Sequence, residues 1–214
     1  MKVNSFWMKK VVGIKLVVKG EPGTHANPVV ICNHQSWFDI PIIQDVITGT
    51  GPMVKFLIKR ELVWVPIIGW ICQVMGFPKL GRSKRSDTRK DDIAAVQTIS
   101  MGHEDEAGAL LIFPEGTRFS EEKKTRQQSP YQHLLKPRSG GLKIIKHHVS
   151  QATTLVDQTI DYHKTGVRIW ECLHGDPGLI TVTIAHYELA EINDLDAWLN
   201  NRWAEKDRGF TVRK

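Results

Sequence analysis

Two short aliphatic runs, each followed at once by a polar loop, constrain the fold of this chain most strongly. Residues 29–32 read Val-Val-Ile-Cys and lead into 33–39, Asn-His-Gln-Ser-Trp-Phe-Asp. Residues 109–113 read Ala-Leu-Leu-Ile-Phe and lead into 114–118, Pro-Glu-Gly-Thr-Arg. Short apolar runs that are closed by turn-forming residues are typical of buried strands. We therefore predict two core strands, each of which feeds a functional loop.

The rest of the chain alternates between strand and helix patterns. A helix is predicted from about Asp39 to Val46, with Asp39 as its N-cap and Pro41 in the first turn, where a missing N–H is harmless. Further helices are predicted after Asp87, over 142–148 and over 192–207, with a loop or exposed helix over 119–137 and strands over 14–19, 53–58, 152–162 and 178–187. Strands that alternate with helices indicate a layered α/β fold, with the functional loops at strand ends.

Composition sets limits on the class of protein. A chain of 214 residues fits one domain and can bury a core without disulfides or metals. The net charge of +6 and the pI near 9.2 favour anionic partners, which leaves nucleic acid, an anionic membrane surface and phosphorylated substrates open. The three cysteines form no C-x-x-C pair and indicate reduced thiols in a cytosol-facing protein: Cys32, Cys72 and Cys172.

Neither a signal peptide nor a spanning helix is evident in the sequence. Lysines are scattered through residues 1–20, and the most apolar segment, 62–78, is broken by two prolines and a glycine. It is also shorter than the roughly 20 apolar residues of a membrane span. Segment 62–78 is interpreted either as a helix covered inside the core or as an interfacial segment whose Trp64 and Trp70 lie at lipid headgroup level.

His34 and Asp39 are the candidate catalytic pair. A neutral imidazole suits proton abstraction near pH 7, and a carboxylate on the opposite ring nitrogen fixes the tautomer and stabilises the imidazolium. The chain has no G-x-S-x-G motif, and Ser36 lies too close in sequence to be assigned as the nucleophile, so the attacking hydroxyl is expected to belong to the substrate. A structural hydrogen bond between the two residues is the alternative. A metal site is less favoured, because no third ligand lies nearby.

The loop 113–118 has the residues of an anion site. Gly116 lets backbone N–H groups approach an anion, Thr117 adds a hydroxyl, and Arg118 can bind a phosphate through two parallel hydrogen bonds. Glu115 is unexpected there because its charge should repel phosphate, and we expect it to hold an arginine or a substrate hydroxyl. The alternative is a tight turn with a solvated salt bridge.

Other basic residues give weaker signals. Arg82 is a candidate second phosphate ligand, and Lys59 follows an apolar strand, but either pattern alone equally fits a solvated surface residue. His147 and His148 are adjacent, so they point to different faces of a helix and are interpreted as surface residues.

Together these motifs resemble the glycerolipid acyltransferase family, the lysophosphatidate (1-acylglycerol-3-phosphate) acyltransferase-like enzymes. His34 and Asp39 match the family's H-x-x-x-x-D block, residues 76–82 match its glycine-to-arginine block, and 113–118 match its F-P-E-G-T-R block without a change. Residues 59–62 and 65–70 resemble the segment that links the family's first two blocks. Residues 134–141, 156–160 and 198–207 are similar to the branch with lysocardiolipin acyltransferase-like enzymes. The resemblance covers residues 29–207.

The resemblance implies an acyltransferase-like fold, with a central mixed sheet flanked by helices, in a single domain over 1–214. It also implies a reaction in which His34, oriented by Asp39, deprotonates the free hydroxyl of 1-acyl-glycerol-3-phosphate, which then attacks the thioester of acyl-CoA or acyl carrier protein and forms phosphatidic acid. The residues that it assigns to the acceptor phosphate are Arg82, Glu115, Gly116, Thr117 and Arg118, with Lys59 as a weaker candidate. No cofactor, metal or covalent acyl-enzyme is implied.

The implied partners are lysophospholipid and acyl-CoA substrates and a membrane surface, not nucleic acid. Family members usually carry a membrane-anchoring stretch before the first block, where this chain has a short lysine-rich one. Either an N-terminal anchor is missing, or the protein attaches through segment 62–78 and its basic surface. The expected location is the cytoplasmic face of a membrane, such as a bacterial inner membrane.

Several alternatives stay open at the level of sequence. The acceptor could instead be lysophosphatidylglycerol, lysocardiolipin or glycerol-3-phosphate, and the protein could be a catalytically silent lipid-binding homologue. A nucleic-acid-binding domain is supported by charge alone, because the aromatic residues are not interleaved with the basic stretches. The sequence does not determine the acyl-chain preference, the choice between coenzyme A and carrier protein, or the oligomeric state.

Overall fold

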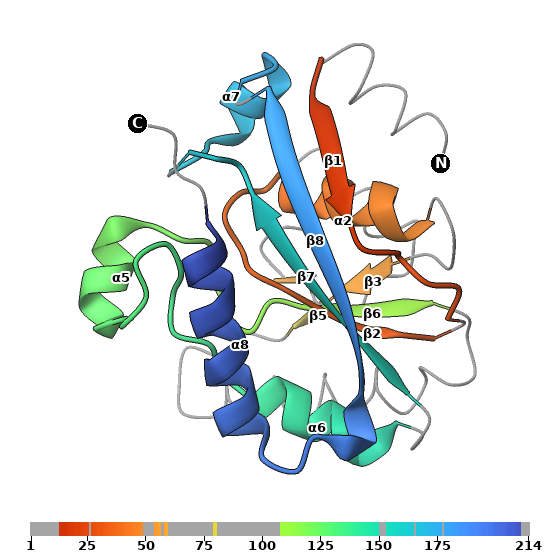
Figure 1. Ribbon diagram of the computed structural model, residues 1–214. Helices are drawn as coiled ribbons and strands as arrows, with labels where there is room; N and C mark the ends of the chain where they lie inside the picture. Colours follow the sequence, from red (N-terminus) through yellow and green to blue (C-terminus); the bar gives the residue numbers. More distant parts are fainter. Residues whose placement is uncertain are drawn as a thin grey trace.

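Strand β2 (Val29–Cys32) lies inside a six-stranded mixed sheet in the order β1-β8-β7-β2-β6-β3 (Figure 1). It pairs in parallel with β6 (Ala109–Ile112) on one side and with β7 (Thr154–Asp161) on the other. All four of its side chains are buried, as its apolar sequence predicts. Because β2, β6 and β7 run in the same direction, their carboxyl ends meet at one edge of the sheet.

The computed structural model describes residues 13–25, 27–48, 54–56, 58–59, 79–80, 108–149, 153–164, 166–176 and 178–210. The remaining strands of the main sheet are β1 (Lys15–Lys19), β3 (Val54–Phe56) and β8 (Leu179–Glu188), and β7 and β8 form its antiparallel pair. A separate two-stranded sheet joins β4 (Ile58–Lys59) and β5 (Lys79–Leu80). The helices are α2 (Asp39–Thr48), α5 (Glu121–Gln127), α6 (Gly140–His148), α7 (Ile169–Leu173), the 3₁₀ turn η3 (Leu189–Glu191) and α8 (Leu195–Gly209).

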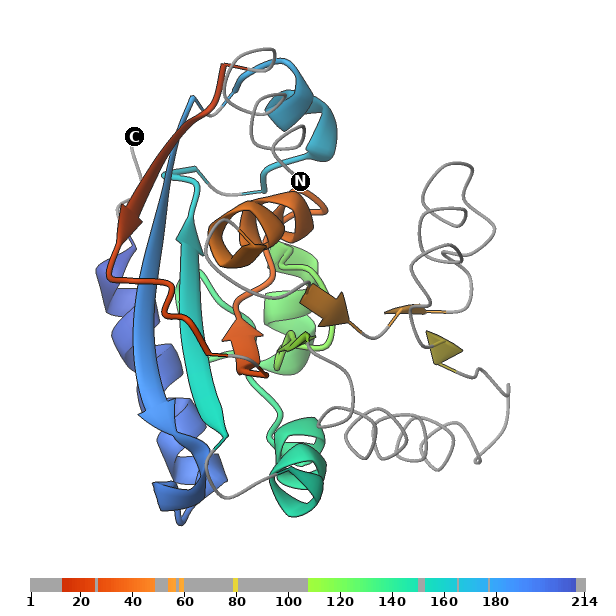
Figure 2. The ribbon, with the colours of Figure 1, turned by 90° about the vertical axis from the view of Figure 1, so that its right-hand side faces the viewer.

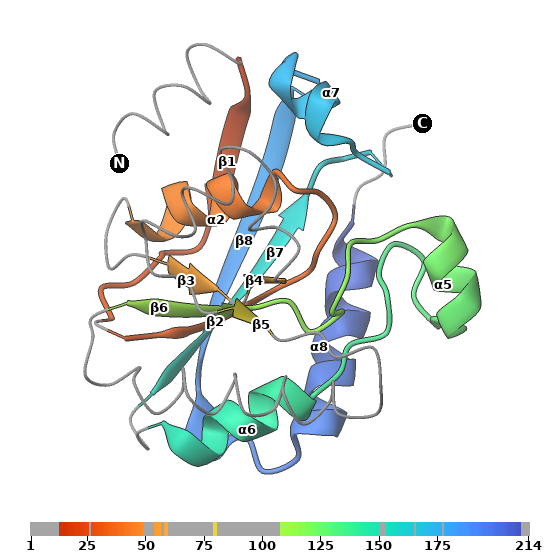
Figure 3. The ribbon, with the colours of Figure 1, turned by 180° about the vertical axis from the view of Figure 1, so that it is seen from behind.

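The two faces of the sheet carry separate cores. On one face, Ile42 and Ile43 of α2, together with the preceding Phe38, pack against residues of β2 and β7. On the opposite face, α6 and α8 pack through residues such as Leu142 and Trp203. Figure 2 shows α2 and α8 on opposite sides of β7 and β8, and Figure 3 shows α2 from behind, lying across the sheet. The α/β fold with a central mixed sheet is therefore confirmed.

Most predicted elements within the described ranges agree with the observed ones. The single strand predicted over 53–58 is instead divided between β3 and β4, which belong to different sheets, and β5 and η3 were not predicted. Two further differences concern helices. The first is α7, a five-residue helix that periodicity did not indicate. The second is the N-terminus of α2, where the prediction of Asp39 as N-cap is wrong. The helix begins at Asp39 itself, and the carboxylate accepts hydrogen bonds from the residues before it instead of from the first turn of the helix.

Some of the sequence predictions fall on residues outside the described ranges. They concern Arg82, Cys72, the apolar segment 62–78 and the helix after Asp87. Lys59 lies in β4, and its side chain is also outside the description. In the described ranges, none of the helices has both the length and the apolar character that crossing a bilayer would need.

Candidate active site

The loop between β2 and α2 holds His34 against Asp39, the first residue of α2. His34 Nδ1 lies 2.8 Å from Asp39 Oδ2. The same oxygen accepts hydrogen bonds from the backbone N–H groups of Gln35, at 2.7 Å, and of Ser36, at 3.0 Å. The Asp39 side chain is fully buried, so these donors compensate for the loss of water around its charge. Asp39 thus holds the backbone of residues 35 and 36 and also fixes the orientation of the His34 imidazole.

A second loop, which follows β6, holds His34 from the other side. The backbone N–H of His34 donates to Glu115 Oε1 at 3.3 Å, and the backbone N–H of Phe119 donates to the His34 carbonyl at 2.8 Å. The Phe113 ring stacks on the imidazole at a centroid distance of 4.0 Å. Within the described part of the chain, no hydrogen bond reaches Nε2, and the His34 side chain is 13% exposed. One ring nitrogen is therefore oriented by the protein while the other remains for a reactant.

The predicted anion loop forms a tight turn beside this pair. Gly116 has φ of +68°, a value that favours glycine, and its N–H donates to the Phe113 carbonyl at 2.9 Å. The glycine N–H therefore closes the turn. The Thr117 hydroxyl accepts a hydrogen bond from Lys123 Nζ at 3.0 Å, and the same ammonium group donates to the Arg118 carbonyl at 2.8 Å. Lys123 of α5 thus adds a cation that the sequence motif did not single out.

Arg118 is half-buried, and in the described residues no carboxylate pairs with it. Its guanidinium lies over the Trp37 ring at 4.6 Å from the centroid, so a residue of the first loop positions a cation of the second. Burial lowers the pKa of Arg118, and the nearby Asp39 carboxylate opposes that change. An arginine that is partly dehydrated and has no counter-ion is suited to bind an anionic substrate group.

We expected Glu115 to hold an arginine or a substrate hydroxyl, but among the described residues it pairs with no arginine, and it does not face open solvent. It is buried, and its two carboxylate oxygens accept hydrogen bonds from the backbone N–H groups of His34 and of Leu135, the latter at 3.1 Å. Burial raises its pKa from 4.5 to about 8, although these hydrogen bonds act in the opposite direction. Near neutral pH the carboxyl is therefore mainly uncharged, which removes the expected repulsion of a phosphate. Glu115 shapes the site by joining its loops.

The two described cysteines lie behind this loop and are poor nucleophiles. Cys32 and Cys172 are both free and buried. Burial raises the pKa of Cys172 to about 12, with the Asp39 carboxylate as the next cause, and burial likewise raises the pKa of Cys32. Since the thiolate is the reactive form, neither cysteine is suited to form an acyl-enzyme.

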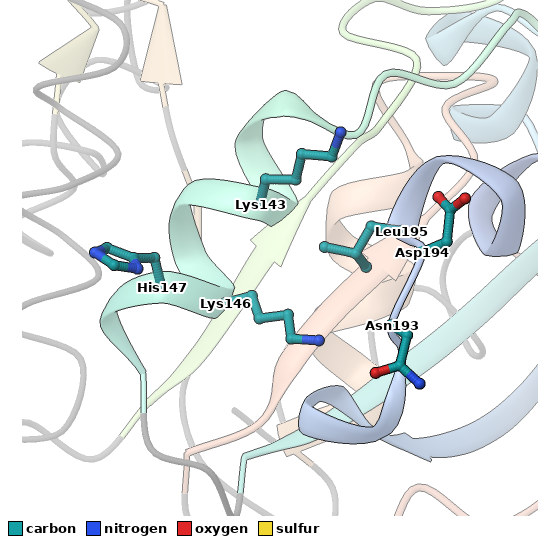
Figure 4. A pocket seen from close by; sticks show the side chains of 6 residues that line it. All are labelled: Lys143, Lys146, His147, Asn193, Asp194 and Leu195. Atoms are coloured by element: carbon teal, nitrogen blue, oxygen red, sulfur yellow. The ribbon is translucent and has the colours of Figure 1, made fainter.

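A separate surface hollow of about 630 Å³ lies where α6 meets the start of α8 (Figure 4). Figure 4 shows Lys146 extended toward the segment 193–195 and His147 pointing the other way. The cations of this hollow are already engaged: Lys146 donates to the carbonyls of Ala190 and Ile192, and Lys143 pairs with Asp196. No residue of the two active-site loops lines the hollow, so we place the candidate site at the loops.

Besides Lys123, three contributions to the site come from residues that the sequence did not single out. Phe113 was noted only as part of its motif, and its stacking on His34 depends on the pairing of β2 with β6. Asn33 and Tyr162 join the first loop to the end of β7. Hydrophobic periodicity gave no signal for these contacts, because they depend on which strands are neighbours.

The chain was compared with known proteins. A family model described as Acyltransferase matches residues 15–160. A 1-acyl-sn-glycerol-3-phosphate acyltransferase of Saccharomyces cerevisiae is 30% identical over 76% of this chain and 52% of its own length. Lysocardiolipin acyltransferase 1 of Mus musculus is 27% identical over 91% of this chain and 56% of its own length. The chain thus spans about half the length of these relatives.

A solved structure supports the fold. The 1-acyl-sn-glycerophosphate (LPA) acyltransferase PlsC from Thermotoga maritima superposes with a TM-score of 0.63, covering 100% of this chain and 83% of that one, at 18% sequence identity.

Proposed function

Because the chain belongs to the Acyltransferase family, we propose that it transfers a fatty acyl group from a thioester to the free hydroxyl of 1-acyl-glycerol-3-phosphate, which yields phosphatidic acid. The donor would be acyl-CoA or acyl carrier protein. The observation that carries this proposal is the immobilised His34 ring. Its Nδ1 faces Asp39, its ring face packs on Phe113, and its Nε2 is left for a hydroxyl.

The chemistry follows from this arrangement. His34 Nε2 accepts the proton of the acceptor hydroxyl while the oxygen attacks the thioester carbonyl carbon. The buried Asp39 carboxylate stabilises the imidazolium that forms. When the tetrahedral intermediate collapses, the carbon–sulfur bond breaks and the proton leaves with the thiol. Protonated cysteines near the site offer no competing nucleophile, which supports direct transfer to the substrate oxygen.

The acceptor phosphate would bind at the turn that carries Thr117 and Arg118. The Arg118 guanidinium, which pairs with no carboxylate in the described part of the chain, supplies charge and a planar pair of donors, and Lys123 lies close by on the Thr117 hydroxyl. The uncharged Glu115 makes this environment more favourable for an anion. Arg82 and Lys59 remain candidate ligands of the same phosphate.

Thiol release from oleoyl-CoA, with and without 1-acyl-glycerol-3-phosphate in detergent micelles, tests the reaction. His34→Ala should lower acceptor-dependent release by about 10²–10⁴-fold, the usual contribution of a general base. Arg118→Ala should act chiefly on acceptor KM, and Arg126→Ala on the exposed side of α5 is the matched control. Release that is unchanged in His34→Ala would support a silent lipid-binding homologue, and an unchanged acceptor KM in Arg118→Ala would contradict the phosphate assignment.

The preferred acceptor can be identified by assaying a panel of acceptor substrates. Lysophosphatidylglycerol, lysocardiolipin and glycerol-3-phosphate share the free hydroxyl and the phosphate that the two loops would bind. The similarity to an enzyme named lysocardiolipin acyltransferase makes lysocardiolipin the second candidate. The ratio of kcat/KM values across the panel, measured with coenzyme A and carrier-protein donors, identifies the preferred pair.

A further inference from the structure

Tyr162, the residue after β7, reaches the candidate catalytic pair from the end of the strand next to β2, on the face of the sheet that α2 covers. Its hydroxyl donates to Asp39 Oδ1 at 2.6 Å, across 123 positions of sequence. The Tyr162 side chain is 1% exposed, and Asp39 is fully buried. A hydrogen bond between two groups that are shielded from water is stronger than the same bond at the surface.

The two oxygens of Asp39 have different partners. Oδ2 accepts from His34 and from the backbone N–H groups of Gln35 and Ser36. Oδ1 accepts from Tyr162, which is its only donor among the described residues. The local loop thus holds one oxygen, and the second is held by a different strand of the sheet.

The end of β7 also fixes the start of the same loop. Asn33 Nδ2 donates to the Ile160 carbonyl at 2.9 Å, and the Ile160 N–H donates to Asn33 Oδ1 at 2.8 Å. Ile160 contacts Asn33 through its main chain, and Tyr162, two residues later in the same segment, contacts Asp39 through its hydroxyl. A shift of β7 relative to β2 would therefore disturb Asn33 and Asp39 together.

We propose that Tyr162 is a positioning residue of the His34–Asp39 pair, because its hydroxyl holds the Asp39 carboxylate in the orientation that keeps His34 aligned as the base. This inference rests on the proposed function for its kinetic readout. Burial and the adjacent carboxylate raise the pKa of Tyr162 well above its ordinary value, so the hydroxyl keeps the proton that it donates.

Other ionisable groups also surround the pair. The thiols of Cys32 on β2 and Cys172 on α7 are protonated and uncharged, while Glu115 and the guanidinium of Arg118 approach from the second loop. None of them donates to Asp39 Oδ1. Loss of the Tyr162 hydroxyl would therefore leave a buried carboxylate oxygen without a donor.

Loss of the Tyr162 hydroxyl should change the pH dependence of activity in one direction. The Tyr162 hydrogen bond stabilises the Asp39 anion most when His34 is neutral, because the imidazolium competes for the same charge. Its removal makes protonation of the pair more favourable, and the inactive protonated form persists to higher pH. The acid limb of the kcat/KM profile should therefore move to higher pH.

Tyr162→Phe is the test, with Tyr131→Phe as the matched control. Tyr131 is also buried, but its hydroxyl donates to Asn200, away from the site. We expect Tyr162→Phe to lower kcat about tenfold with both KM values unchanged and to shift the acid limb, whereas Tyr131→Phe keeps the wild-type profile. A merely structural role for Tyr162 would lower thermal stability in both variants but would leave the acid limb in place, and that result would overturn the proposal.

A titration of the His34 ring by NMR in the free protein separates this inference from the proposed function. In Tyr162→Phe the ring should titrate at higher pH than in wild type, whatever reaction the protein catalyses. An unchanged titration together with a wild-type pH profile would refute the role of Tyr162, even if His34→Ala abolishes activity. If the titration shifts but the protein shows no acceptor-dependent thiol release, the proposed acyl transfer is refuted. The link between Tyr162 and the His34–Asp39 pair then still holds.

Discussion

At the scale of the residue, Glu115 shows how burial changes the meaning of a motif. The acidic residue of the F-P-E-G-T-R sequence would oppose phosphate binding if it were ionised and exposed. In the structure it is buried, accepts backbone hydrogen bonds from His34 and Leu135, and has a pKa raised to about 8. The group therefore joins two loops in its neutral form.

This raised pKa predicts a pH-dependent stability. The folded protein holds the Glu115 proton up to about pH 8, whereas the unfolded chain releases it near 4.5. The stabilisation is therefore complete below pH 4.5 and is lost as the pH rises toward and through 8. Urea unfolding at pH 5.5 and 8.5 should show a decrease in unfolding free energy that is smaller in Glu115→Gln, by about 1–4 kcal/mol.

The other titrating groups are the same in both proteins, so the comparison isolates Glu115. Because a glutamine offers one acceptor oxygen where Glu115 offers two, Glu115→Gln should also lose about 1 kcal/mol at pH 5.5. An identical pH dependence in the two proteins would mean that Glu115 is ionised in the folded state.

At the scale of the element, α8 supports the site without entering it. Asp207 accepts hydrogen bonds from the backbone N–H groups of Gln132 and His133, at 2.7 and 2.6 Å. The same loop carries Leu135, which donates to Glu115, and the His133 carbonyl accepts from the Gln35 amide. Helix α8 thus holds the segment 132–135, which is hydrogen-bonded to both loops of the candidate site.

A buried charge anchors α8 to the sheet. Lys206 is 4% exposed, pairs with Asp157 of β7, and donates to the Gln158 carbonyl at 2.6 Å. Lys206→Met would leave the buried Asp157 with Arg202 as its only cation among the described residues and should cost about 3 kcal/mol of unfolding free energy. Lys143→Met removes an exposed pair with Asp196 and should cost less than about 1 kcal/mol. Equal losses in urea unfolding would contradict this difference.

Local and long-range contacts differ in how far the sequence predicted them. The contact between His34 and Asp39 was predictable, because five positions of sequence bring the two residues into one loop. The contact between Tyr162 and Asp39 was not, since it depends on β7 lying beside β2 in a register that places Gln158 opposite Cys32. Apolar patterns identify strands but do not give their order. The five residues of α7 were too few to show a helical period.

At the scale of the whole molecule, the net charge of +6 bears on where the protein works. A basic surface gathers at anionic lipid and is screened by salt. We expect cosedimentation with vesicles that contain phosphatidylglycerol, decreasing several-fold between about 0.05 and 0.5 M salt, and little with pure phosphatidylcholine. Equal, salt-independent binding to both vesicles would instead indicate insertion of apolar side chains.

The central position of β2 also has a consequence for synthesis on the ribosome. Val29 pairs with Leu110 on one edge and with Leu155 on the other, so its partners are made long after it emerges. At about 5–20 residues per second, the nascent chain carries this aliphatic strand unpaired for on the order of ten seconds. Such an edge is a target for chaperones and a hazard for aggregation. The loop that carries His34 cannot take its final shape until β7 has been translated.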